Sequence, residues 1–248
     1  QRYDRELADI FEVQDEIATA IATALRLTLA HAASAGPRYL PTLPAYEAYL
    51  QARHHFFQQT SESVPRAIEG FQRAAALDPQ YPAPHIELGA CYLILWYFGL
   101  RSGKEMTPLI ASEARLAQEL GHFTPRGNGL LGVVAAAYNY DREEAARLFE
   151  ASLKENVGSD AEARWSYATF YLAPAGRFDE ALRLLELVID ADPLNTTWRG
   201  ATAQYLNMAG RHELALQRTA EIMALDSKYW VAYLYAAEAY AALGRWPE

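Results

Sequence analysis

Residues 176–211, GRFDEALRLLELVIDADPLNTTWRGATAQYLNMAGR, contain one full period of a repeat and the start of the next. The pair Gly176-Arg177 returns as Gly210-Arg211 and again as Gly244-Arg245, each time 34 residues further along the chain. Each pair follows an apolar stretch with helical spacing. A period of roughly 20–50 residues is typical of folds built from stacked supersecondary units. We therefore predict a helical repeat protein.

Three residue types mark the boundaries of each repeat. Glycine is predicted to end the first helix, because the turn needs a left-handed backbone conformation that costs glycine little. Ala181 and Ala215 recur at the same spacing, and we expect them where two antiparallel helices approach closely. Asp192-Pro193 is predicted to end the second helix, because proline disfavours helical geometry at its predecessor and cannot donate the next hydrogen bond. Asp226-Ser227 stands at the corresponding place one period later.

The same pattern extends upstream with looser spacing. Leu88-Gly89 and Leu131-Gly132 provide a large and a small residue where a hairpin partner is expected to pack. Five hairpins and a lone last helix over 229–243 are predicted in all. The three early hairpins pair 45–58 with 64–77, 81–100 with 106–121, and 125–138 with 142–155.

The segment before the hairpins differs in character. Residues 5–29 are predicted to form a single helix with one apolar stripe, from Ile10 to Leu25. Prolines at 37, 41 and 44 indicate a stiff linker. The expected organisation is therefore an N-terminal helix and join to an upstream domain over 1–35, a linker over 36–44, and the repeats over 45–248. Because the chain starts without Met and stops inside a repeat, we interpret it as a fragment of a longer protein.

Composition excludes several classes of function. The net charge is −9 and the sequence has no basic run, so neither nucleic acid nor an anionic membrane surface is an expected partner. The single cysteine, Cys91, lies in an apolar stretch and is expected to be a buried, inert thiol. The longest uncharged apolar run, 88–100, is shorter than the roughly 20 residues that a spanning helix needs. We expect a soluble fragment, and the sequence does not choose between cytoplasm and periplasm.

Two motifs resemble a dinucleotide-binding site and a zinc site, but each lacks a feature that the site requires. Residues 127–132, GNGLLG, match a dinucleotide-binding fingerprint, but that chemistry needs a preceding strand, and an alanine-rich helical segment precedes them here. His54-His55 does not have the spacing of a zinc site, since adjacent helical residues point in different directions. We expect no catalytic residue, no metal and no cofactor.

The hairpins resemble the tetratricopeptide repeat family over about residues 45–248. Upstream, residues 3–18, YDRELADIFEVQDEIA, followed by 45–53, AYEAYLQAR, are similar to a join in bacterial signalling proteins, where a TolB-like domain precedes the repeats. In those proteins the output domain is often a nucleotide cyclase, a winged-helix DNA-binding domain or a protein kinase. The resemblance implies a right-handed α-solenoid with an extra N-terminal helix, which serves as the sensory or scaffolding part of a regulator.

In this family the first helix of each hairpin forms the concave inner face, and this implies a set of partner-binding residues. They are Arg53, Phe56, Arg126, Phe170, Gln204, Asn207 and Glu238. The set lacks the Lys/Asn array with which some members clamp a terminal carboxylate. Most of the many aromatic residues are expected to pack between layers.

The leading hypothesis is therefore a non-catalytic module that binds a peptide, a protein surface or its own upstream domain through the concave face. The alternative is a structural module that self-associates and so dimerises an output domain.

Overall fold

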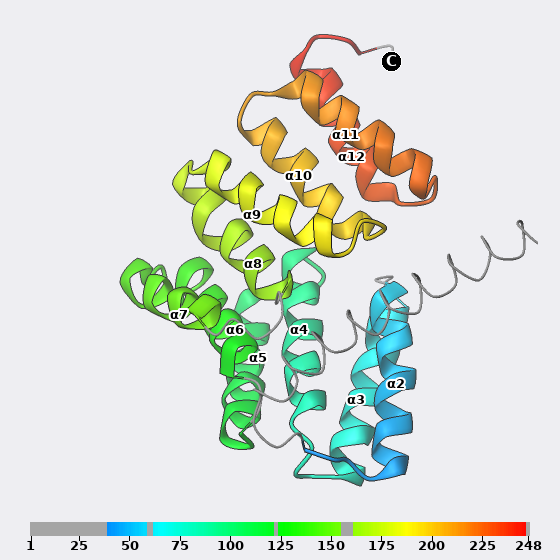
Figure 1. Cartoon of the computed structure of the whole chain (residues 1–248), viewed down its shortest axis with the longest axis vertical. Helices are drawn as coiled ribbons and strands as arrows, with labels where there is room; N and C mark the ends of the chain where they lie inside the picture. The colour runs from blue at the N-terminus through cyan, green and yellow to red at the C-terminus, as the bar shows by residue number, and fades with distance from the viewer. Residues whose placement is uncertain (1–38, 59–61, 122–123, 155–160, 247–248) are drawn as a thin grey trace, which may run out of the picture. The chain divides into compact units, whose positions relative to one another are not determined.

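The computed structural model describes residues 39–58, 62–121, 124–154 and 161–246. These residues form eleven α-helices and no strand, which confirms the predicted all-helical repeat class (Figure 1). The predicted N-terminal helix and the start of the proline-rich linker lie outside the described residues. The first described helix begins at Leu43, with Pro44 in its first turn, where a missing N–H costs nothing.

Each first helix packs against the second helix that follows it, and three of the five also pack against the helix two elements further along the chain. The hairpins are α2 (Leu43–Gln58) with α3 (Ser63–Leu77), α4 (Ala83–Tyr97) with α5 (Gly103–Glu119), α6 (Thr124–Ala137) with α7 (Arg142–Lys154), the composite helix described next with α9 (Phe178–Ala191), and α10 (Thr196–Met208) with α11 (His212–Leu225). Helix α12 (Trp230–Ala242) follows and packs on α10 and α11.

The first helix of the fourth hairpin is not uniform. It starts as α8 (Ala161–Tyr167), continues as the π-helical turn η1 (Ala168–Leu172) and ends in the 3-10 turn η2 (Ala173–Ala175). A π-helical turn is a local insertion into a helix and is found frequently at functional sites. Here it carries Phe170.

The glycines of the repeated Gly-Arg pairs adopt the predicted conformation. Gly176, Gly210 and Gly244 have φ angles of 73°, 74° and 72°. The backbone N–H after each glycine donates to the carbonyl five residues earlier, as from Arg211 to Leu206 at 2.8 Å. The last carbonyls of each first helix are thereby satisfied, and the chain reverses into the second helix.

The second helices end at aspartate, also as predicted. Asp192 and Asp226 leave the helical conformation with φ angles of −140° and −144°, and Asp78 does the same at −148°. The carbonyl of each accepts a hydrogen bond from the residue three positions on, at 3.0 to 3.2 Å. One turn geometry therefore links successive hairpins at three places in the chain.

Small residues lie at the close approaches between helices. Ala181 and Ala215 are fully buried, as predicted. A Cβ atom added to Gly132 would lie 3.0 Å from the ring of Phe149 on the partner helix. At Gly89 the crowding comes from Leu130 of the following hairpin instead of from the partner helix.

The glycines of 127–132 lie inside α6, and the described element before them is helix α5. The dinucleotide-binding interpretation therefore lacks the strand it requires. Cys91 is buried, and burial raises the pKa of its thiol, which favours the unreactive protonated form.

Aromatic side chains join hairpins that are not neighbours in sequence. Tyr97 at the end of α4 packs its ring 5.6 Å from Trp165 of α8 and 5.8 Å from Phe170. Phe98, one residue further on, lies 6.1 Å from Trp230 at the start of α12. The stack of hairpins is therefore curved, and residues at the end of α4 contact α8, η1 and α12 across the inner face of the stack.

Candidate partner-binding groove

A cavity of about 320 Å³ opens on the inner face that the first helices share. Its lining comes from α2, α4, α6, α8, the first turn of α10 and the turn that precedes it, and second helices contribute nothing to it among the described residues. We call this cavity, with the residues that line it, the groove. A first-helix lining follows from the architecture, because the first helices lie on the inside of the curve and the second helices on the outside.

The floor of the groove is apolar and its edge is exposed. Leu93 of α4 and Leu130 of α6 are buried beneath it. Phe57, Phe98 and Leu194 stand at its edge, and Leu194 is 76% exposed. Exposed large apolar residues around a concave apolar surface are typical of an interaction site.

One wall of the groove is aromatic. The ring of Trp165 lies 5.6 Å from Tyr97 and 6.1 Å from Trp198. The hydroxyl of Tyr97 donates to Oε1 of Gln204 at 3.2 Å. Burial raises the pKa of Tyr97, so its hydroxyl stays protonated and able to donate at neutral pH.

Arg126 and Glu162, the charged residues that line the groove, are linked to Glu87, a buried residue outside its lining. Arg126 donates from Nη1 to Oε1 of Glu87 at 3.0 Å and from Nη2 to Oε2 at 3.3 Å. Glu87 is only 4% exposed and also accepts a hydrogen bond from the hydroxyl of Tyr49 at 3.2 Å. Glu162 of α8 lies 3.9 Å from Arg126 and keeps 46% of its side chain exposed. A buried carboxylate must be paired to be tolerated, so Arg126 serves first to neutralise Glu87.

The structure places the seven residues predicted for the concave face in three groups. Phe56 and Arg126 line the groove. Phe170 and Gln204 contact Tyr97 of the aromatic wall, while Arg53 lies with its guanidinium 5.0 Å from the ring centre of Phe57.

Two of the seven lie elsewhere. The side-chain amide of Asn207 donates to the carbonyl of Tyr235 at 2.8 Å, a contact between α10 and α12. Glu238 is exposed on α12. Neither residue lines the groove.

Other lining residues were missed by the sequence analysis. Leu194 and Asn195 belong to the turn between α9 and α10, Trp198 to the first turn of α10, and Glu162 and Trp165 to α8. Asn195 was recognisable as a helix cap, and its Oδ1 accepts from the N–H groups of Thr197 and Trp198. Its place beside the groove depends on the curvature of the stack, which the repeat spacing does not report.

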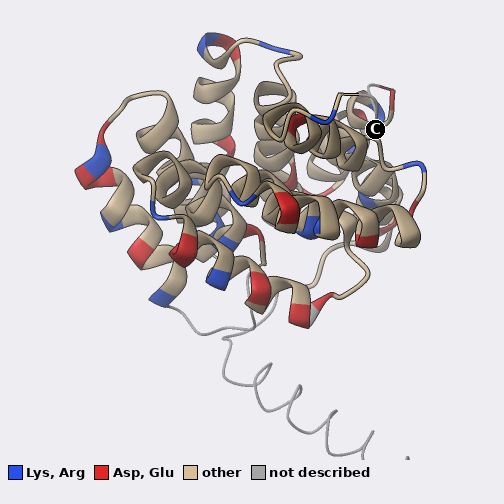
Figure 2. Ribbon diagram, turned by 90° about the horizontal axis from the view of Figure 1, so that it is seen from above, with Lys and Arg blue, Asp and Glu red and all other residues tan. Residues whose placement is uncertain are grey.

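Other kinds of site lack support in the described part of the chain. It contains no cluster of three or more His, Cys, Asp and Glu side chains that could hold a metal ion. None of its helices has both the length and the apolar character needed to span a membrane. Acidic and basic residues are interspersed along its helices and do not form a basic stripe in the view of Figure 2.

Comparison with curated sequences gives a distant similarity to regulators. The chain is 24% identical over 154 residues to the transcriptional regulator HilA of Salmonella paratyphi A, and to HilA of Salmonella typhimurium to the same extent. The matched region covers 62% of this chain and 27% of the relatives. This chain therefore corresponds to about a quarter of their length.

Solved structures with a similar fold are helical-repeat proteins. IFIT1 in complex with Gppp-AAAA has a TM-score of 0.66 at 16% identity, covering 82% of this chain and 48% of IFIT1. TTC0263, a TPR protein of Thermus thermophilus, has a TM-score of 0.61 at 17% identity, with 79% and 99% covered. PilW, a type IV pilus biogenesis factor, has a TM-score of 0.56 at 15% identity, with 82% and 88% covered.

The family model for the tetratricopeptide repeat matches residues 136–205, from the end of α6 to α10. This stretch includes the fourth hairpin and the aromatic residues of α8 that line the groove. Family model and structures together support the tetratricopeptide assignment, and the fold of the described chain is that of an all-helical repeat protein.

Proposed function

We propose that this chain is a non-catalytic module that binds a peptide or protein segment in the groove. The observation that carries the proposal is the groove's composition, an apolar floor and exposed apolar edge assembled from five first helices. Tetratricopeptide folds generally act as scaffolds for other proteins, and the residues of the groove offer no nucleophile paired with a base.

We further propose that the module belongs to a bacterial signalling or transcription regulator. The support is the similarity to the transcriptional regulator HilA and to the join that follows a TolB-like domain. In such a protein the groove would hold either a separate partner or a segment of the upstream part of the same chain.

Nucleic acid is not the ligand that we propose, although IFIT1 was solved with Gppp-AAAA. Among the described residues, Arg126 is the one arginine that lines the groove, and it is paired with Glu87. Phosphate binding depends on several Lys and Arg side chains whose charge is available to the ligand.

The test is a selection from a random peptide display library, followed by affinity measurements on a groove-filling variant. Ala90 of α4 lines the groove and is half-buried, so Ala90→Phe would occupy space that the peptide needs. Ala220→Phe on the exposed face of α11 adds the same side chain away from the groove. Selected peptides should lose at least about tenfold in affinity for Ala90→Phe and keep it for Ala220→Phe.

Circular dichroism and thermal unfolding would first establish that both variants fold. Peptides that bind Ala90→Phe as tightly as the unchanged chain would contradict the proposal.

Self-association is the second candidate, and the exposed face of α12 favours it. Leu234 and Ala237 are exposed there, whereas the residues one repeat earlier, Gly200 and Ala203, are buried by the following repeat. An exposed helix face of this kind can pack against the same face of a second chain. Sedimentation equilibrium should then show a dimer that Leu234→Lys dissociates. A chain that remains monomeric at high concentration would exclude this route.

A further inference from the structure

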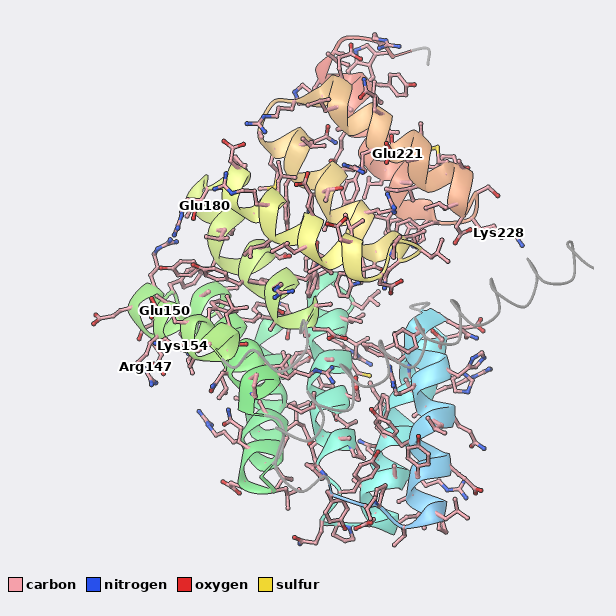
Figure 3. All side chains as sticks on the ribbon, viewed as in Figure 1. Arg147, Glu150, Lys154, Glu180, Glu221 and Lys228 are labelled. Atoms are coloured by element: carbon pink, nitrogen blue, oxygen red, sulfur yellow. The ribbon has the colours of Figure 1, made fainter. Side chains whose placement is uncertain are left out.

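Aromatic residues are concentrated in the lining of the groove. Six of its residues carry aromatic rings, and they come from α2, the end of α4, α8 and the start of α10: Phe56, Phe57, Tyr97, Phe98, Trp165 and Trp198. The outer surface is different in character, because the exposed side chains of α7 that Figure 3 labels are charged: Arg147, Glu150 and Lys154. A ligand in the groove therefore meets aromatic rings that belong to several helices.

The rings of the groove are not stacked face to face. Trp165 meets Tyr97 at an interplanar angle of 75° and Trp198 at 51°, and Phe56 meets Phe57 at 65°. Such angles leave wedge-shaped spaces between rings instead of a closed stack. Proline side chains are flat, saturated rings that fit spaces of this kind, and aromatic-lined grooves are a recurring way of binding proline-rich segments.

The polar groups of the groove complement the partial negative charge of carbonyl oxygens. Among the described residues, the indole N–H groups of Trp165 and Trp198 have no acceptor, and neither is sealed from solvent. Two side-chain acceptors in the lining already have partners, because Asn195 accepts from two backbone N–H groups and Glu162 is paired with Arg126. A ligand with free carbonyls and few N–H groups leaves no buried polar group unsatisfied here.

The size of the groove favours an extended ligand over a helical one. One turn of α-helix with its side chains occupies roughly 400 Å³, more than the whole cavity of about 320 Å³. A helix also uses its carbonyls internally, whereas a polyproline II segment advances about 3.1 Å per residue and leaves them free. A ligand strand would need a sheet edge, and the described part of the chain contains no strand.

We infer that the ligand of the groove is a proline-rich segment in the polyproline II conformation. Its proline and other apolar side chains lie on the floor and between the rings, and its carbonyls accept from the indole N–H groups of Trp165 and Trp198. The inference rests on the proposed function and names the chemistry of the partner. The conformation is formed before binding, so little ordering entropy is lost.

The first test uses three labelled peptides of one length, acetylated and amidated at their ends, and fluorescence anisotropy with the 248-residue chain. One alternates proline pairs with leucine, the second replaces every proline by alanine, and the third is the all-D enantiomer of the first. The proline peptide should bind at least about fivefold tighter than the alanine peptide, because it is preorganised. It should exceed its enantiomer by at least as much, because the enantiomer forms a helix of the opposite hand.

The second test removes the donors and keeps the rings. Trp165→Phe and Trp198→Phe should each weaken binding of the proline peptide about threefold to tenfold, the effect of one lost hydrogen bond. The matched control is Trp246→Phe, which removes an indole from an exposed residue that does not line the groove. It should leave the affinity unchanged, and circular dichroism would establish that all three variants fold.

Nitrogen-15 NMR reports the same bonds without a change in stability. The chain has five tryptophans, and single Trp→Phe variants assign their indole N–H resonances. Binding of the proline peptide should move the resonances of Trp165 and Trp198 downfield, as expected for new hydrogen bonds, and leave that of Trp246 in place.

Equal binding of the proline and alanine peptides, equal binding of the two enantiomers, or equal effects of Trp165→Phe and Trp246→Phe would overturn the inference. Peptides without proline that are selected by display and lose affinity for Ala90→Phe would overturn it as well, while upholding the groove as a binding site. If the proline peptide does not bind, the inference falls, and the display selection decides separately whether the proposed function falls with it.

Discussion

The turns between first and second helices are not the same in the third hairpin and in the hairpins that follow it. Glycine holds the left-handed position after α4, where Gly99 has a φ of 67°, and in the late repeats, where φ is near 73° at Gly176 and Gly210. In the third hairpin the corresponding residue before α7 is Tyr140, which has a φ of 56° and a largely exposed side chain. Non-glycine residues adopt this conformation at a cost, so the early turn is held by its surroundings.

The second helices also differ, in the size of one buried side chain. Four of the five second helices, α3, α7, α9 and α11, have a buried residue four positions after their first alanine. That residue is Phe71 in α3 and Phe149 in α7, but Leu185 in α9 and Thr219 in α11. The third hairpin therefore combines a turn without glycine with a fully buried aromatic ring, whereas the fourth and fifth combine a glycine turn with a smaller buried side chain.

The largest expected difference between the two regions comes from truncating these buried residues. Phe149→Ala should lower the free energy of unfolding by about 3–5 kcal/mol, because it removes a fully buried ring. Thr219→Ala should cost about 1 kcal/mol, since Thr219 donates only a local bond to the carbonyl of Leu216. Urea unfolding followed by circular dichroism measures both. Similar losses in the two variants would show that the regions do not differ in this way.

The second prediction exchanges the turn residues. Gly176→Ala should cost about 1 kcal/mol, because alanine must adopt a positive φ. Tyr140→Gly should raise the free energy of unfolding by up to about 0.5 kcal/mol. Glycine adopts the positive φ at no cost, and this gain is partly offset by the greater freedom that glycine gives the unfolded chain. Thermal unfolding midpoints report the sign of each change. A destabilised Tyr140→Gly would mean that the tyrosine side chain contributes more than its backbone costs.

The third prediction concerns ion pairs that link neighbouring late repeats. Arg211 contacts Asp179 at 2.6 Å, and Arg245 contacts Glu213 at 3.5 Å, both on the exposed surface. Arg211→Ala should therefore cost no more than about 0.5 kcal/mol, and less at high salt. The control is Arg147→Ala, which breaks the pair with Glu144 inside α7. If Arg211→Ala lowers the free energy of unfolding clearly more than the control does, the Arg211–Asp179 pair contributes to the packing of neighbouring repeats.

The smallest difference is expected at high pH, where the two regions should respond alike. Tyr81 and Tyr229 follow the same aspartate turn, and burial raises the pKa of each to about 12. Stability from keeping them neutral is complete below the unfolded pKa near 10 and is lost as pH rises towards 12. Absorbance at alkaline pH should show delayed ionisation in the folded chain. Replacing either tyrosine by phenylalanine should reduce the alkaline loss equally, and a one-sided effect would contradict the equivalence of the two turns.

Local features were predictable from the sequence where one residue type determines the geometry. The spacing of Gly176 and Gly210, and the aspartate at 192, give turns that depend on a few neighbouring residues. Tyr140 could not be predicted, because a tyrosine in a left-handed turn contradicts its own preference. The groove was predictable only in part, since contacts such as Tyr97 with Gln204 join residues separated by 107 positions. Such contacts depend on the summed curvature of several hairpins.

The most direct test of this account is to map where a selected peptide lies. A peptide from the display selection, carrying a photoreactive group beside its apolar anchor, would be cross-linked to the chain and the attachment points located by mass spectrometry. We predict attachment within the groove, at α4, α6 or α8, near Leu93, Leu130 and Trp165. Attachment to the second helices α5, α7, α9 or α11 would contradict the claim that the first helices form the binding surface.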